Sequence, residues 1–336
     1  MRGSLFYAIR NSTVDAAPYS LTGLTGTKAA YAQNRFGANL GGPLFGNTFF
    51  FLNYTGNILR NGSNLTGTLP TLAERSGDFS AINSVLFDPQ TGQPFGGNQL
   101  PGFRINSIAQ GLLAYIPAPN QPGTINNYRY TVANPNNSHS LNSRVQFSVS
   151  RRDQLAVGVN WQTRDSESTQ LFGFTDTSSG DGLNGNINWR HNFGNAKFNN
   201  FTFGLNRNTN FATPYFANGP NVAAQLGIQG TSSDPANFGP PNLSFTNYAA
   251  LSDGSPSRGA VTSATISDSF LLRLGKHNWN VGAGITRNWN NTITDANGRG
   301  TFTFTGLGTS QLNANGQAVN GTGRGNNLVH KREGNS

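Results

Sequence analysis

Residues 279–289 alternate between apolar and polar side chains, reading Trp, Asn, Val, Gly, Ala, Gly, Ile, Thr, Arg, Asn, Trp. A period of two residues predicts a strand with one apolar face. Ten steps of about 3.3 Å, tilted by about 40°, rise roughly 25 Å, which is the height of the apolar band on a transmembrane β-barrel. An indole stands at each end, so the segment is typical of a strand that crosses a membrane.

The same alternation recurs along the chain. Ile187 and Trp189 stand between polar neighbours, and Phe201, Phe203 and Leu205 alternate with Asn, Thr and Gly. A soluble antiparallel sheet with one wet face would alternate too, so further signals are needed. We expect about ten strands, at 3–10, 35–42, 48–57, 141–151, 154–165, 182–192, 197–211, 261–274, 277–290 and 299–306.

Short and long connections alternate between these strands. Three short ones, within 45–49, 193–198 and 274–279, contain Gly followed by Asn or Lys, which is typical of tight hairpins. A fourth, 151–154, lacks Gly. The long, polar ones are 11–34, 58–140, 166–182, 212–260 and 291–299. Bacterial barrels have short periplasmic turns and long extracellular loops. We therefore predict an all-β fold, a segment of an antiparallel up-and-down transmembrane β-barrel.

The apolar face predicts which side chains meet the bilayer. Counted from the short turns, aromatic residues form two girdles at the membrane interfaces: Trp161, Trp189, Phe201, Trp279 and Trp289. Between them, the residues expected to face lipid are Val157, Val159, Phe203, Val281, Ala283 and Ile285. Arg207 and Arg287 share this face but lie about ten residues from their turns, where a charge costs about 0 to 1 kcal/mol.

The long connection 58–140 carries helical signals. Ile105, Ile108, Leu112 and Ile116 recur at helical spacing before Pro117, and Thr71 with Glu74 fits a capping box. We expect short helices that pack an external loop. The chain is thus divided into a partial barrel, 1–310, which includes this insertion, and a polar Gly/Asn-rich tail, 311–336.

Composition supports a barrel over a cytosolic domain. Only 11% of the 336 residues are charged, against about 25% in a typical soluble domain, and Gly accounts for 42. A surface of Asn, Ser, Thr, Gln and Gly suits a lumen wall and exposed loops. Arginines are scattered despite the net charge of +9, so no nucleic-acid partner is expected.

The start of the chain bears on its origin. Met1 to Ser4 lead directly into Leu5–Phe6–Tyr7–Ala8–Ile9, without the long apolar region of a signal peptide. Because a barrel needs such a signal to reach the outer membrane, we expect a fragment or a late-starting gene model. The sequence contains no run of about 18 apolar residues, so no transmembrane helix is predicted.

Specific runs of residues resemble one family in order and spacing. Among them are 3–11, 34–44, 48–54, 70–80, 87–89, 97–101, 104–106, 115–120, 275–277 and 300–304. Together they resemble Oar-like TonB-dependent transporters over roughly residues 2–310. The resemblance implies a plugged outer-membrane barrel of a Gram-negative bacterium that imports a scarce solute, energised through TonB.

The chain departs from that family at both ends. Nothing in it resembles the plug, the TonB-contacting box or the N-terminal domain, and the tail 331–336 lacks a terminal aromatic residue. The resemblance implies as partners outer-membrane lipid, a plug domain, further barrel strands and the TonB complex. We expect a fragment that cannot transport alone, and the substrate class stays open among iron chelates, oligosaccharides and peptides.

Candidate chemistry is sparse. The four His residues are far apart, there is no Cys, and no carboxylate pair sits in a catalytic pattern. Residues 23–28 lack the spacing of a phosphate-binding loop, and Asp176 and Asp181 fit a solvated turn better than a Ca²⁺ site. We therefore expect that the chain is not an enzyme and that it binds neither a cofactor nor a metal ion. The alternative function is a secreted Asn/Gly-rich adhesive or structural β protein.

Overall fold

A computed structural model describes residues 1–16, 30–194, 197–319 and 322. Nine strands form one antiparallel sheet in the order β1-β2-β3-β4-β5-β6-β7-β9-β10, so each strand pairs with its neighbour in the chain apart from the short β8. Their bounds are β1 Arg2–Asn11, β2 Tyr31–Pro43, β3 Thr48–Gly67, β4 Tyr128–Ser148, β5 Asp153–Thr169, β6 Thr175–Gly194, β7 Lys197–Thr213, β9 Ser257–Leu274 and β10 His277–Thr294. The predicted all-β, up-and-down architecture is confirmed.

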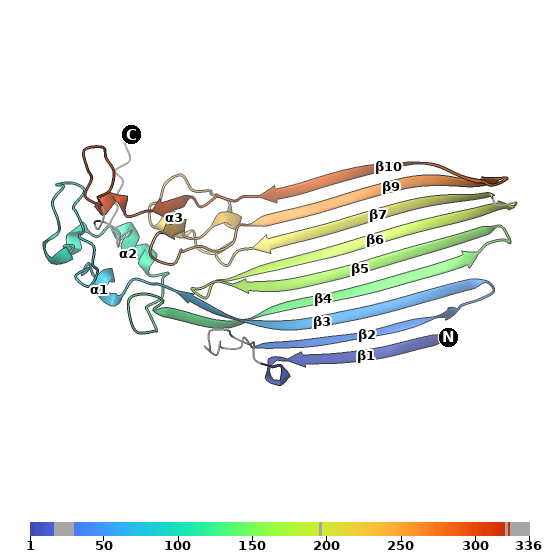
Figure 1. Ribbon diagram of the computed structural model, residues 1–336, viewed down its shortest axis with the longest axis horizontal. Coiled ribbons are helices and arrows are strands. Elements are labelled where there is room, and N and C mark those ends of the chain that lie inside the picture. The colour runs from blue at the N-terminus through green and yellow to red at the C-terminus, as the bar shows by residue number, and fades with distance from the viewer. Residues whose placement is uncertain (17–29, 195–196, 320–321, 323–336) are drawn as a thin grey trace.

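The two ends of this sheet carry different kinds of connection. Figure 1 shows the strands running along the long axis, with short turns at one end and every helix at the other. The turn between β6 and β7 lies displaced along the sheet from the end of β9, because Lys197 at the start of β7 pairs with Leu272, two residues before β9 ends. Such a stagger accompanies the strand tilt of a barrel wall.

The strands extend further toward the helical end than expected. β3 continues to Gly67 and pairs with β4 as far as Tyr128, so the connection predicted at 58–140 spans only 68–127. The long connection predicted at 166–182 is wrong, because β5 and β6 pair up to Thr169 and Thr175 and leave a five-residue turn, 170–174. Many positions in these strand ends are Asn, Ser, Gly, Thr or Asp, and the backbone hydrogen bonds of the ladder hold them, so the alternating pattern is weak there.

The tenth predicted strand, 299–306, is not part of the wall. Its residues form β11 (Thr301–Phe304), which pairs in parallel with β8 (Asn242–Phe245) in a separate two-stranded sheet. Phe245 and Phe304 stack there with ring centroids 5.4 Å apart. The alternation of Thr and Phe predicted a strand correctly, but a period of two residues does not tell which sheet the strand joins.

The connections at the helical end pack into a loop cap, made of residues 68–127, 214–256 and 295–319. Its helices are α1 (Leu72–Arg75), α2 (Ser107–Leu113) and α3 (Val222–Gln225), and its 3-10 turns are Gly96–Asn98, Gly102–Arg104, Pro235–Asn237 and Leu307–Thr309; one more 3-10 turn, Ser12–Val14, follows β1. The predicted capping box is confirmed: Thr71 Oγ1 accepts from the Glu74 backbone N–H and Glu74 Oε2 accepts from that of Thr71.

Buried polar groups fix the loop cap around its apolar core. The core contains Leu69, Leu112, Ile116, Leu243 and Leu251. Fully buried Asn127 bonds both backbone groups of Leu69, at 2.7 and 2.8 Å, and the Arg75 guanidinium donates to the carbonyls of Ile116 and Pro117.

A tyrosine and an ion pair join distant parts of the cap. Tyr248 donates to Glu74 Oε1 at 3.0 Å. Burial and the Glu74 carboxylate raise the pKa of Tyr248 above its usual value, so the phenol stays protonated. Buried Arg299 forms an ion pair with Asp253. No helix in the described part of the chain has the length and apolarity needed to cross a bilayer.

The remaining segments that the sequence analysis considered are the stretch 23–28, the histidines, the tail and two aspartates. The stretch 23–28 lies outside the described residues, as do His330 and most of the tail predicted at 311–336. Asp176 and Asp181 lie in β6 and not in a turn. The Asp176 carboxylate accepts hydrogen bonds from the Gln170 side chain at 2.7 Å and from the backbone N–H groups of Tyr215 and Gly254, both at 2.9 Å, so it joins β6 to the loop cap.

Candidate functional site

Register places all the predicted membrane-contacting side chains on one face of the sheet. Directly opposed residues of antiparallel strands share a face, so the pairing can be followed from β10 back to β1. One row across seven strands is entirely apolar: Phe50, Val145, Val157, Ile187, Phe203, Ile266 and Ile285. We name the side that carries this row the apolar face.

The predicted girdle residues lie on both sides of that row. Trp189 and Phe201 are directly paired toward the short turns, and Trp279 lies nearer still to its turn. Trp161 and Trp289 lie toward the loop cap, in one row with Tyr54 and Arg207. Val159, Val281 and Ala283 share the apolar face too. Trp279 is 58% exposed and Ile285 72%, so large apolar side chains on this face meet the surroundings of the sheet. Their contact with lipid stays a prediction.

The apolar face also carries an aromatic cluster that the sequence analysis did not predict. Tyr54 Oη lies 2.8 Å from His139 Nδ1, the two rings stack with centroids 6.1 Å apart, and Phe36 packs beside them at 6.2 Å from Tyr54. These residues lie on β2, β3 and β4, toward the loop cap. Their alternation with polar neighbours was visible in the sequence, but only the register shows that they form one cluster.

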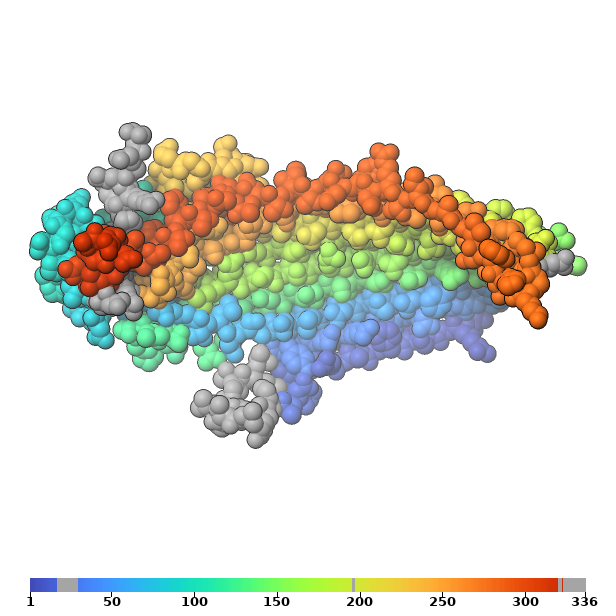
Figure 2. Space-filling model, turned by 45° about the horizontal axis from the view of Figure 1, so that its top comes forward, coloured from blue at the N-terminus to red at the C-terminus, as the bar shows by residue number. Residues whose placement is uncertain are grey.

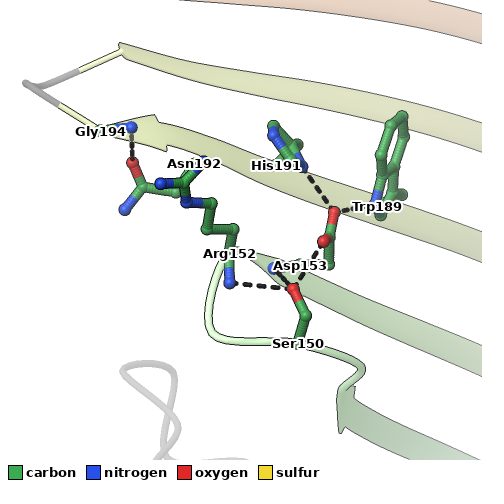
Figure 3. Close-up of polar contacts among 7 residues, drawn as sticks. All are labelled: Ser150, Arg152, Asp153, Trp189, His191, Asn192 and Gly194. Atoms are coloured by element: carbon green, nitrogen blue, oxygen red, sulfur yellow. Dashed lines mark hydrogen bonds and ion pairs between the residues drawn. The ribbon is translucent and has the colours of Figure 1, made fainter.

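A carboxylate at the turn end holds one girdle indole. Asp153 Oδ1 accepts from Trp189 Nε1 at 3.1 Å and lies 2.6 Å from His191 Nδ1, while Asp153 Oδ2 accepts from Ser150 Oγ at 2.6 Å (Figure 3). Ser150 and His191 each contact the carboxylate and not each other, which differs from the serine–histidine contact of a hydrolase triad. The arrangement satisfies the indole N–H at the edge of the apolar band, where Trp prefers one apolar and one wet end.

A carboxylate lies on the apolar face beside a girdle residue. Asp268 pairs with Phe201 on one side and Ala283 on the other, and its Oδ1 accepts from Asn199 Nδ2 at 2.7 Å. The alternating pattern of β9 does not reveal it, because Ser267 and Ser269 next to it are also polar. Arg287 on this face lies 4.9 Å above the Trp289 ring, a cation–π contact.

The opposite side of the sheet, the polar face, carries Asn, Gln, Ser, Thr and Gly at most positions. The same register places these central residues on it: Thr55, Asn57, Ser140, Gln162, Asn184, Asn206 and Thr265. Two surface hollows lie on this side. Figure 2 shows the strands as one continuous wall that ends in the loop cap. A wall with an apolar outer face and a polar, hollowed inner face is the design of a barrel with an aqueous lumen.

No metal centre is built into the described part of the chain, where no three His, Asp or Glu side chains cluster closely enough to share an ion. The buried acids of the loop cap are engaged with protein partners, as Asp253 is with Arg299 and the Phe216 backbone N–H.

Comparison with known proteins agrees with this geometry. Residues 1–328 match the family described as outer membrane beta barrel domain. Among solved structures, the chain aligns with Salmonella typhi OmpF in complex with daunomycin at 9% identity, over 85% of this chain and 96% of that one, but with a TM-score of 0.09, too low to support an argument. No curated protein matches. The chain belongs to the outer membrane beta barrel domain family and resides in the outer membrane.

Proposed function

We propose that the chain is part of the barrel wall of a TonB-dependent transporter that imports a scarce solute and performs no catalysis. The observation that carries the proposal is the ordered series of motifs that resemble Oar-like transporters across residues 2–310. Its proposed partners are outer-membrane lipid, a plug domain, further barrel strands and the TonB complex.

The number of strands supports a larger parent barrel. Nine strands form the wall, and β1 and β10 each have one side without a partner among the described residues. Transporters of this class have about 22 strands around a plugged lumen. An unpaired edge cannot be left in lipid, because its backbone N–H and C=O groups would have no hydrogen-bond partners. Further strands are therefore part of the proposal.

The loop cap supports a role in capture. It carries its own apolar core and buried ion pair at the end where the loops are long. Loops of more than about 15 residues are commonly functional. A folded loop assembly at the mouth of a barrel is suited to contact a solute before it enters.

Energised uptake tests the proposal. In a host that expresses the intact protein, we expect uptake of its solute to stop when TonB is deleted and to return when TonB is supplied. Residues 1–336 alone should not restore uptake to a strain that lacks the intact protein. Passive uptake that persists without TonB would contradict the proposal, as would restoration by residues 1–336.

A further inference from the structure

The polar face contains a hollow of about 430 Å³ over β2 to β5, between two arginines. Arg35 pairs with Asn57, Asn57 with Ser138, and Ser138 with Arg164, so the four side chains form one row across four strands. Three strand spacings of about 4.8 Å separate the Cα atoms of the two arginines by roughly 14 Å. The floor between them consists of short polar side chains.

No acid among the described residues balances the positive charge of this row. Arg35 and Arg164 have no ion pair or side-chain hydrogen bond with any described residue. Among the described strand positions of the polar face, the one acid is Asp176, and its carboxylate is already bonded to Gln170, Tyr215 and Gly254. Two unpaired guanidinium groups on the wall of a hollow attract anions.

Two glycines of β6 keep the hollow open. A Cβ at Gly180 would lie 3.0 Å from both Nε and Nη2 of Arg164, and one at Gly182 would lie 2.6 Å from Nε2 of Gln162. The side chains of Arg164 and Gln162 therefore lie over bare backbone of β6. They border the hollow without filling its centre.

We propose that this hollow binds a solute that carries two or more carboxylate or phosphate groups. The inference rests on the proposed function, for which it names the class of solute. Each guanidinium offers a planar fork of donors that matches one carboxylate or phosphate, and the separation of the arginines fits two anionic groups on one molecule. Asn57, Gln33 and Ser138 offer neutral hydrogen bonds to its body, and the volume lies within the range of small-molecule sites.

A matched pair of rigid probes tests the inference on the intact protein in detergent. Calorimetric titration should detect binding of benzene-1,3,5-tricarboxylate and none of the uncharged 1,3,5-tris(hydroxymethyl)benzene. Affinity for the tricarboxylate should fall about ten- to hundredfold in Arg35→Gln and in Arg164→Gln, since each removes a charged hydrogen-bond donor. Arg207→Gln, on the apolar face, should leave it unchanged. In the unsubstituted protein, affinity should fall as ionic strength rises.

Several results would overturn the inference. The first three are no binding of the tricarboxylate, equal binding of the neutral analogue, and an affinity that does not depend on salt. The fourth is an unchanged affinity in both Arg35→Gln and Arg164→Gln, provided that their circular dichroism matches that of the unsubstituted protein and so shows that they are folded. An acidic protein segment that fills the hollow would give the first of these results. Tricarboxylate binding in a protein whose uptake does not need TonB would contradict the proposed function alone. TonB-dependent uptake without tricarboxylate binding would contradict this inference alone.

Discussion

Phe203→Arg should lower the free energy of unfolding of the intact barrel in a bilayer by about 2 to 4 kcal/mol, the cost of an arginine on the lipid face near the membrane midplane. Phe203 lies on β7 and pairs with Ile187 on one side and Ile266 on the other, within the fully apolar row. An arginine there has no carboxylate directly beside it in either neighbouring strand. The measurement is reversible denaturant unfolding of the protein in lipid vesicles.

The matched control is the next residue of the same strand. Thr202→Arg introduces the same charge on the polar face, where Thr202 pairs with Asn188 and Ser267. We expect a change within about 0.5 kcal/mol, as for other wet surface positions. Equal losses in the two variants, or a larger loss in Thr202→Arg, would contradict the assignment of the faces. Ala283 is less suitable, since Asp268 directly opposite would pair with a new arginine.

Residues 1–336 on their own should aggregate or stay bound to chaperones. β1 and β10 both present an edge with no partner among the described residues, and every residue of β10 is exposed. The sequence predicted 299–306 as the last strand of the wall, whereas the structure ends the wall at β10, 277–294. A long unpaired edge beside a broad apolar face invites pairing with other chains.

Analytical ultracentrifugation after refolding in detergent is the check. We expect large, polydisperse species and no discrete conductance in planar bilayers. A monodisperse monomer that conducts ions would mean that these nine strands close on themselves, contrary to the open sheet seen here. The intact protein, refolded in parallel, serves as the control.

Alternation of side chains predicted the fold where one face is apolar. Each of the first nine predicted strands overlaps a strand of the wall, and the residues predicted to lie at the interfaces and to face lipid all fall on one face. The prediction failed where the alternation is weak. At 58–67 and 175–181 backbone pairing continues through Asn, Ser, Gly and Thr, residues that also favour loops.

The hollow on the polar face could not be predicted from the sequence. Arg35, Asn57, Ser138 and Arg164 come from four strands, and only the register of three strand pairs brings them into one row. A slip of one residue in any pair would move an arginine to the other face. Asp268 was missed for a similar reason, because only pairing reveals that its neighbours across the sheet are Phe201 and Ala283.

Site-directed spin labelling along β7 tests the central claim most directly. Labels are placed one at a time at positions 201 to 206 of the intact protein in lipid vesicles. Labels at 201, 203 and 205 should be accessible to oxygen, which concentrates in the bilayer, and labels at 202, 204 and 206 should not. The opposite alternation would mean that the polar face meets lipid. Equal accessibility at all six positions would mean that this sheet does not cross the membrane.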